Sequence, residues 1–403
     1  MKQQCVILAV ILLIRIPVIA QPCLPQGITF STQAQIDSFP FTHPNCTEIQ
    51  GIVYITGNDI TNLNGLSSIV SVGTDLYIRN TSSLTDLSGL NNLISVGNEI
   101  SIGGNALLNS LDDLGGLAYV GYAFELDYNP SLNNLDGLNS LAFIGGYLMI
   151  NDNSSLMSLS GLNALITIGG GLNISRNPIL TNPGGLENLT STGDGLILSQ
   201  NSSLTSLEGL SNLSIIGGSL AIGQNPVLSS LESLSALTSI GETLWINDNN
   251  SLHTLTGLDN INANSIADLT ISDNDSLSTC EVLSVCSYLS SPNGNVVVQN
   301  NSAGCNNVAE IETACRAIST PEKDLSASFL IYPNPADQII SIPSDLKGKI
   351  KEVNFYNENG VRLLNIHQGS NNIDVSLLPQ GYYIVEFILN ESIIHKKLVI
   401  KNK

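Results

Sequence analysis

The most regular feature of the chain is a leucine that returns every 24 residues. It recurs nine times without a slip, and the positions six and three residues before it and three and six residues after it are mostly apolar. Apolar residues spaced by three do not fit an α-helix, whose buried stripe alternates steps of three and four. The pattern therefore predicts a loose turn sequence that repeatedly points inward, centred on Leu66, Leu90, Leu114, Leu138, Leu162, Leu186, Leu210, Leu234 and Leu258.

The second part of each 24-residue unit predicts a short strand. Counting from the central leucine, glycine stands at position +7 in eight units, and apolar residues such as Leu148 and Ile150 alternate at +10 and +12. Glycine at +7 allows the positive φ or the close approach that a corner needs. Asparagine at +15 is expected to form an inward ladder that bonds backbone groups at the bend. Its seven members are Asn105, Asn129, Asn153, Asn177, Asn201, Asn225 and Asn249.

Self-similarity at this period predicts a solenoid, in which each coil stacks on the next. At about 4.8 Å per coil, nine coils and their ends give a rod of roughly 50 Å. Two capping boxes, Thr32–Gln35 and Asn307–Glu310, predict helices that cover the open ends. The predicted fold class is all-β dominated: a leucine-rich right-handed β-solenoid over residues 21–318 with disulfide-stapled caps, followed by a second, smaller domain.

The second domain begins where the 24-residue phase is lost. Residues 319–328 have the composition of a linker. Beyond it, segments rich in β-branched and aromatic residues predict strands, and Asn357–Gly360 has the sequence of a hairpin turn. Together they predict a small β-sandwich over residues 329–403. The expected strands are Gln338–Ile342, Ile350–Asn357, Gly360–Ile366, Gly381–Leu389 and Ile393–Ile400.

The charge is unusually low and unevenly divided between these regions. Only 12% of the residues are charged, against about 25% in an ordinary globular domain. Residues 21–315 carry 25 acidic and two basic side chains, a net charge of −23, whereas residues 316–403 carry nine acidic and ten basic ones. A polyanionic solenoid argues against nucleic acid or an anionic membrane surface as partner.

The N-terminus predicts export. Lys2, an apolar run from Cys5 to Ile14 and the small residue Ala20 have the order of a secretory signal, expected over residues 1–20. The run is too short to span a membrane, which takes about 20 residues, and no other segment approaches that length.

An exported chain with an even number of remaining cysteines predicts disulfides. Six remain, clustered at the two ends of the solenoid. Cys23 and Cys46 form the natural first pair. The last four allow three connectivities, of which we favour Cys280 with Cys305 and Cys286 with Cys315.

A ligand site is expected on the strand face, because the outward residues at +9, +11 and +13 are free of core packing. Trp245 is the only tryptophan, and its neighbours Ser219, Ala221 and Gly223 are small. An open ring suits stacking against a sugar or an apolar side chain; alternatively it simply covers Ala221. The candidate ligand-binding residues are Tyr77, Met149, Ile197, Trp245 and Asn247.

Acidic residues gather at the other end of this face, at Asp75, Glu99, Glu125 and Asp127. Stacked carboxylates of this kind could hold Ca²⁺ or imitate the paired acids of a retaining glycosidase. The alternative is a solvated acidic face, as the net charge already predicts, and a flat face gives little burial to raise a catalytic pKa. We therefore predict no catalytic residues, no resident metal and no cofactor.

Residues from about 23 to 316, with coils of the form LxIxxNxxLxxLxGLxxLxxIGG and cysteines at both ends, resemble the receptor L-domain type of leucine-rich β-helix. The resemblance implies an extracellular recognition module.

Residues 329–403 resemble the type A C-terminal sorting domain of type IX secretion cargo. The matching positions lie in three segments: Tyr332, Pro333, Asn334 and Pro335; the stretch ending at Gly360; and the stretch with Gly381, Tyr383, Lys396 and Lys397. This resemblance implies recognition by the type IX machinery and display on, or release from, the surface of a Gram-negative bacterium.

The sequence thus predicts a secreted, non-enzymatic recognition or adhesion protein, expected as a monomer, that binds a glycan or a protein through the strand face. Two alternatives stay open: a polysaccharide-active enzyme that uses the carboxylates near Glu99 and Glu125, and a structural spacer.

Overall fold

A computed structural model describes residues 22–319, 331–341, 350–357, 360–367, 372–389 and 393–401. The chain divides between Cys315 and Arg316 into two compact units, each described by itself below. The expected secretory signal and, apart from Ser319, the expected linker lie outside the described residues. None of the helices in the described ranges is long and apolar enough to cross a membrane.

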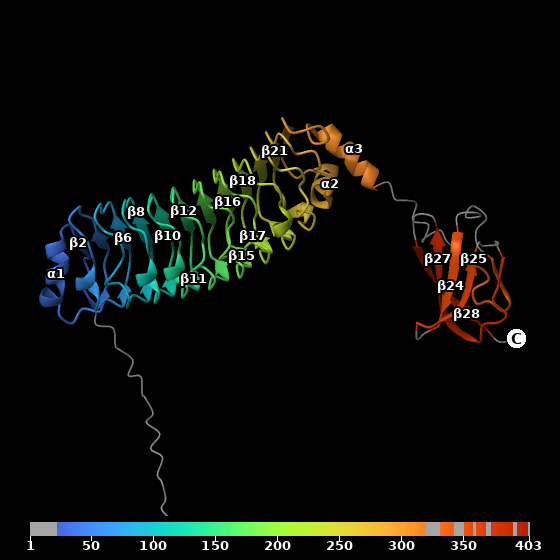
Figure 1. Cartoon of the computed structure of the whole chain (residues 1–403), viewed down its shortest axis with the longest axis horizontal. Coiled ribbons are helices and arrows are strands. Elements are labelled where there is room, and N and C mark those ends of the chain that lie inside the picture. The colour runs from blue at the N-terminus through green and yellow to red at the C-terminus, as the bar shows by residue number, and fades with distance from the viewer. Residues whose placement is uncertain are drawn as a thin grey trace, which may run out of the picture. The chain divides into compact units, whose positions relative to one another are not determined.

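A sheet of twelve parallel strands runs along the first unit (Figure 1). Successive coils contribute successive strands, and the predicted inward pairs, such as Leu148 and Ile150, are buried. From Leu76 to Asn247 each strand pairs with its neighbour in a register of 24 residues. The strands are β2 (Ile28–Phe30), β4 (Val53–Ile55), β6 (Leu76–Arg79), β8 (Ile100–Gly103), β10 (Phe124–Asp127), β12 (Leu148–Asn151), β14 (Leu172–Ser175), β16 (Leu196–Ser199), β18 (Leu220–Gly223), β20 (Leu244–Asn247), β21 (Leu269–Ser272) and β22 (Val296–Gln299). The first two and the last extend the stack beyond the nine coils that the leucines predicted.

A second, narrow parallel sheet lies where the sequence predicted only loose turns. The coils of the first eight central leucines each contribute two residues, at positions +5 and +6, and coil stacking pairs them with one another and with two earlier strands. Two residues show no periodicity, so this sheet had no sequence signal. Its strands are β1 (Pro22–Cys23), β3 (Glu48–Ile49), β5 (Ser71–Val72), β7 (Ser95–Val96), β9 (Tyr119–Val120), β11 (Phe143–Ile144), β13 (Thr167–Ile168), β15 (Ser191–Thr192), β17 (Ile215–Ile216) and β19 (Ser239–Ile240).

One continuous hydrophobic core fills the space between the two sheets. All nine central leucines are at most 2% exposed. The glycines at +7 are required by close approach: a Cβ on Gly121 would lie 1.8 Å from the carbonyl oxygen of Gly97. They do not adopt positive φ, which falls instead at +14, where residues such as Asp152 and Arg176 take φ of 57°, and on a glycine just before the central leucine in five coils.

The predicted asparagine ladder runs through the unit and is fully buried. Asn177 shows the pattern: its Oδ1 accepts the N–H of Asn153 at 3.1 Å, and its Nδ2 donates to the carbonyl oxygens of Ile150 at 2.8 Å and Ser175 at 3.1 Å. The N–H of Asn177 donates in turn to the next member, Asn201. An amide of this kind satisfies backbone groups of its own coil and of the coil before it.

Helices close both ends of this unit: α1 (Gln33–Thr42) at the first, and α2 (Leu283–Ser290) and α3 (Val308–Ser319) at the last. The predicted capping box at Thr32 is present. At α3, Asn307 Oδ1 accepts the N–H of Glu310 at 3.0 Å. The carboxylate of Glu310 also accepts from the N–H groups of Gly304 and Asn306, bonds that lower its pKa.

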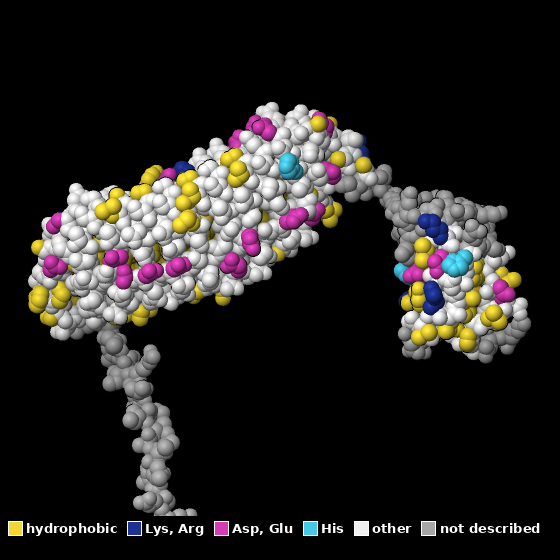
Figure 2. Space-filling model, in the orientation of Figure 1, with side chains coloured by type: hydrophobic (Ala, Val, Ile, Leu, Met, Phe, Trp, Pro, Cys, Tyr) yellow, Lys and Arg dark blue, Asp and Glu magenta, His cyan; other side chains and the backbone are white. Residues whose placement is uncertain are grey.

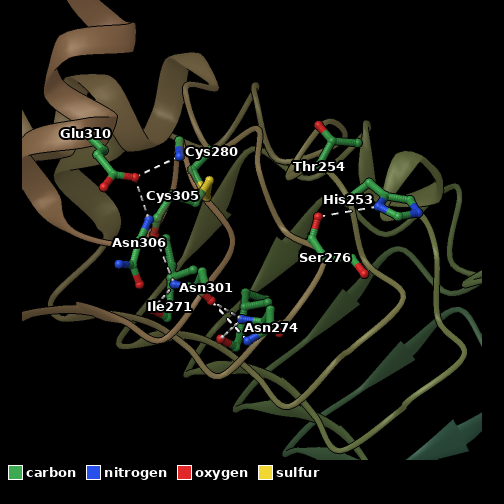
Figure 3. The surroundings of a disulfide bond; sticks show 12 residues. His253, Thr254, Ile271, Asn274, Ser276, Cys280, Asn301, Cys305, Asn306 and Glu310 are labelled. Atoms are coloured by element: carbon green, nitrogen blue, oxygen red, sulfur yellow. Dashed lines mark hydrogen bonds between the residues drawn. A yellow bond between two sulfur atoms is a disulfide. The ribbon is translucent and has the colours of Figure 1, made fainter.

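Three disulfides staple these ends in the pairing that the sequence favoured: Cys23–Cys46, Cys280–Cys305 and Cys286–Cys315. Figure 3 shows Cys280–Cys305 next to the end of the ladder, where Asn301 Nδ2 donates to the carbonyls of Ile271 and Cys305 at 2.9 and 3.1 Å. This disulfide therefore holds the last member of the ladder in place.

The second unit is formed by antiparallel strands. A four-stranded sheet has the order β25-β24-β27-β28, and β23 pairs with β26. Both sheets contribute to one core that includes Ile340, Phe355 and Phe387. The segment Asn372–Asp374 pairs as a strand, although the sequence analysis assigned none there. The bounds are β23 (Ile339–Ser341), β24 (Ile350–Tyr356), β25 (Arg362–His367), β26 (Asn372–Asp374), β27 (Gly381–Leu389) and β28 (Ile393–Ile400).

Candidate functional site

A trough of about 580 Å³ lies on the outward face of the wide sheet, across strands β12 to β20. Its lining residues stand at positions +8 to +11 of five successive coils. They are Tyr147, Met149, Gly171, Leu172, Asn173, Asp194, Gly195, Ile197, Ser219, Ala221, Glu242 and Trp245. We call this surface the trough.

The trough is hollow because small residues separate two bulky ones. Gly171, Gly195 and Ala221 lie between the coils that carry Tyr147 and Trp245. A Cβ on Gly171 would come within 3.3 Å of the Tyr147 ring, so the glycine lets that ring lie down over the sheet. Tyr147 and Trp245 stand on coils four strand spacings apart, which is about 19 Å.

The two aromatic side chains at the ends present themselves differently. Tyr147 leans along the stack, and its hydroxyl donates to Asp194 Oδ2, two coils away, at 3.1 Å. This hydrogen bond, together with the charge of Asp194, raises the pKa of the Tyr147 phenol. Trp245 is 49% exposed and pairs in register with Ala221 and Thr270. Both rings can contact a ligand lying in the trough.

Two carboxylates border the trough at the same coil position, +8, on alternate coils. The N–H of Gly195 donates to Asp194 Oδ1 at 2.8 Å, and the hydroxyl of Ser219 donates to Glu242 Oε2 at 3.0 Å. A carboxylate offers about four acceptor sites. These bonds therefore orient Asp194 and Glu242 and leave acceptor capacity for a ligand.

Of the five residues that the sequence singled out for ligand binding, the trough brings together Met149, Ile197 and Trp245. Tyr77 lies elsewhere on the face, stacked on Tyr54 with ring centroids 4.7 Å apart. The amide of Asn247 donates to the neighbouring Asp248 at 2.7 Å and does not line the trough.

Among the aromatic rings and carboxylates of the trough, sequence reasoning missed three: Tyr147, Asp194 and Glu242. Tyr147 stands at position +9, one of the outward columns, so the column itself was a usable signal. Asp194 and Glu242 stand at +8, two residues before strands β16 and β20 begin, where no alternation points to an outward side chain. Only the stacking of coils brings this column to the edge of the trough.

The four acidic residues at the other end of the face are held by protein partners. Asp75 is 8% exposed and accepts from the Asn98 side chain at 2.6 Å. Arg79 forms an ion pair with Asp127 at 2.8 Å and lies 3.8 Å from Glu125. Across the described ranges, no group of three His, Cys, Asp or Glu side chains has a metal-binding arrangement. The cation beside Glu125 and Asp127 in this structure is thus the guanidinium of Arg79.

Glu99 is the member of this acidic group with a perturbed pKa. Burial raises the pKa of its carboxyl, and the nearby charges of Glu125 and Asp75 raise it further. The hydroxyl of Tyr77 donates to Glu99 at 3.4 Å. Burial and the negative charges of Glu99 and Asp75 raise the pKa of Tyr77 to about 12. This part of the face therefore favours neutral side chains over additional negative charge.

The surface as a whole is strongly acidic. On the face shown in Figure 2, Asp and Glu side chains are spread along the first unit, and Lys and Arg are sparse. The two basic residues between residues 22 and 315 both form ion pairs, Arg79 with Asp127 and Arg176 with Asp152. Their charge is thereby locally neutralised.

In the second unit, the expected motif around Asn334 packs against the last strand. Asn334 Nδ2 donates to the carbonyl of Lys397 at 2.7 Å, and its Oδ1 accepts the N–H of Val399 at 2.9 Å. The Tyr383 hydroxyl donates to the carbonyl of Pro379 at 2.7 Å. Lys397 lines a cavity of about 260 Å³ together with Tyr382, Tyr383, Ile384 and Leu398.

Residues 330–401 match a known family, the secretion system C-terminal sorting domain. The match confirms the sorting domain expected at this end of the chain. Such a domain directs export through the type IX secretion system, which places the protein at the cell surface or outside the cell. Among curated proteins, none matches the chain.

Proposed function

We propose that the first unit is a non-enzymatic recognition module, which the sorting domain carries out of the cell and which binds a glycan or a protein through the trough. The observation that supports this most directly is the trough itself, a concave surface with two exposed aromatic rings on a face that is free of core packing. The resemblance to receptor L-domains and the expected secretory signal agree with an extracellular role.

The architecture suits such a role because the binding surface rests on a rigid support. Hydrogen-bonded strands hold the trough residues from below, and the buried asparagine ladder runs beside them. Ligand sites on regular elements keep their geometry better than sites on loops. Binding therefore requires little ordering of the protein, which lowers its entropic cost.

The proposal is tested with a double variant, Tyr147→Ala with Trp245→Ala, in the displayed protein. We expect cells that carry the variant to lose attachment to the surfaces or polymers that bind the parent, while the amount displayed stays the same. The matched control is Tyr119→Ala with Phe143→Ala, an exposed stacked pair on the narrow sheet. If both double variants lose attachment equally, or if neither loses it, the result contradicts the proposed site and favours a structural spacer.

Export is tested separately by removing residues 319–403. The truncated protein should accumulate in the periplasm, because the sorting domain supplies the signal for outer-membrane transport. Normal surface display of the truncated protein would show that the sorting signal lies elsewhere.

A second candidate function, glycan hydrolysis near Glu99 and Glu125, is favoured by the raised pKa of Glu99, because a general acid must hold its proton at neutral pH. A structural role accounts for the same acidic residues, because Arg79 lies next to Glu125 and Asp75 is hydrogen-bonded to Asn98. If Glu99→Gln with Glu125→Gln abolishes sugar release from a polymer that the parent degrades, the hypothesis of an enzyme replaces that of a recognition module.

A further inference from the structure

We infer that the trough holds an extended glycan without acidic groups, whose chain runs along the stacking direction from Tyr147 to Trp245. This inference rests on the proposed function and names the class of partner for the same site. It follows from three features of the trough: its step length, its polar groups and its charge.

The step length fits a sugar chain better than a peptide. One coil advances by about 4.8 Å, close to the length of one pyranose unit, so a sugar chain lying along the stack would place about one sugar over each coil. A peptide strand advances by about 3.3 Å per residue and repeats its facing side chains every second residue, which does not match the coils. The four steps between Tyr147 and Trp245 correspond to about four sugar units.

The rings at the two ends supply stacking surfaces. An aromatic face packs against the C–H face of a pyranose, and its flat shape requires no side-chain rearrangement. Between the rings, Gly171, Gly195 and Ala221 leave room for the sugar rings to approach the sheet. Substituting a larger side chain at either glycine would fill the depth that the ligand occupies.

The polar groups are mostly acceptors, which complement sugar hydroxyls. Asp194 and Glu242 lie along one edge of the trough. Asp194 is oriented by two protein donors, the Gly195 N–H and the Tyr147 hydroxyl, and Glu242 by one, the Ser219 hydroxyl. Asn173 lies on the trough surface between them and Tyr147. Hydrogen bonds from hydroxyls to carboxylates are stronger than those between neutral groups. The acceptors therefore fix the orientation of the chain, and the rings supply contact area.

The charge excludes acidic polymers. No Lys, Arg or His is among the residues that line the trough, and residues 21–315 carry a net charge of −23. A polymer of uronic acids or phosphorylated sugars would be repelled before contact and would find no cation to pair with on binding. Uncharged glycans and amino-sugar glycans meet neither obstacle.

The test titrates the purified full chain with defined hexasaccharides while recording fluorescence. Trp245 is the only tryptophan of the chain, so the signal reports on the trough. The probes are the hexamers of β-1,4-glucose, β-1,3-glucose, β-1,4-xylose, β-1,4-mannose, N-acetylglucosamine and glucosamine, with hexagalacturonate as the acidic counterpart. We expect a saturable change with at least one non-acidic probe and none with hexagalacturonate.

Two further measurements tie binding to the geometry. Affinity for the active sugar should rise with chain length up to about four units and then level off, because the trough is four coil steps long. By calorimetry, Trp245→Ala and Tyr147→Ala should each weaken binding at least about tenfold. Tyr119→Ala, which removes an equally exposed ring from the other sheet, should leave the affinity unchanged.

The outcomes separate this inference from the proposed function. Three outcomes overturn the glycan assignment: no non-acidic hexasaccharide binds, hexagalacturonate binds best, or the affinity is the same in both ring variants as in the parent. If attachment of cells still depends on Tyr147 and Trp245 in that case, the recognition function stands with a protein partner. If a bound glycan is instead cleaved, the glycan assignment holds and the non-enzymatic function fails.

Discussion

The asparagine ladder makes the sharpest prediction about what holds the coils together, and Asn177 in its middle is the residue to change. Its side chain is fully buried and makes three hydrogen bonds, to Asn153, Ile150 and Ser175. Asn177→Ala leaves the Asn153 N–H without its acceptor. A buried unsatisfied donor costs about 1–3 kcal/mol, and each lost bond to a carbonyl about 1 kcal/mol more.

The carbonyl of Ser175 also accepts the N–H of Asp152 at 3.1 Å, which reduces the cost at that group. The free energy of unfolding should therefore fall by about 3 kcal/mol in Asn177→Ala. Because repeat proteins are stabilised by interfaces between neighbouring units, the loss should fall on the coils adjacent to Asn177 and broaden the unfolding transition.

The assay is urea denaturation of the full chain, followed by circular dichroism and by the fluorescence of Trp245, three coils beyond Asn177. Asn188→Ala is the matched control, since that amide is exposed and donates a single bond to the Asn163 carbonyl at 2.8 Å. We expect a lower midpoint only for Asn177→Ala. Equal midpoints for the two variants would refute the view that the buried ladder carries this energy.

Three further predictions concern charge and cross-links. The pKa of Glu99 is raised in the folded state, so the stability that protonated Glu99 contributes is lost as pH rises through that pKa. Glu99→Gln should therefore raise the thermal midpoint at pH 7, and this gain should vanish in acid. No gain at pH 7 would contradict the argument that burial raises the pKa. The pKa of Tyr77 lies at about 12, against the ordinary value of 10.0, so the stability of the folded protein should fall as pH rises from 10 to 12. Thermal melts over this pH range should show a smaller fall in Tyr77→Phe, which has no phenol to ionise. Replacing Cys280 and Cys305 by alanine opens a link across 25 residues and should cost about 3 kcal/mol, measured by urea denaturation; an unchanged midpoint would show that packing alone holds this cap.

The glycine and asparagine columns show how far the repeat can be interpreted without coordinates. A period of 24 residues places every central leucine in the core, and the strands at +10 to +13 follow from their alternation. The buried amide at +15 follows as well, because a polar residue repeated at an inward position needs backbone partners. The cysteine pairing agreed with the favoured connectivity because the cap brings residues of neighbouring coils together.

The geometry of the corners was harder to predict from the sequence. Glycine at +7 is required by contact with the preceding coil. Positive φ falls at +14, mostly on residues other than glycine, and in five coils on a glycine just before the central leucine. The narrow sheet was missed for a related reason, since two-residue strands carry no periodic signal. Both features arise from stacking, which a single coil does not reveal.

The chain by itself determined which residues face the core, where the sheet runs, which cysteines staple the ends and which tail directs export, because each of these repeats or matches a local pattern. Tertiary structure alone decided which side chains meet on the outer surface. Tyr147 reaches Asp194 across two coils, and Arg79 pairs with Asp127, 48 residues away. These contacts depend on side chains of different coils being stacked next to one another, a proximity that no local pattern encodes.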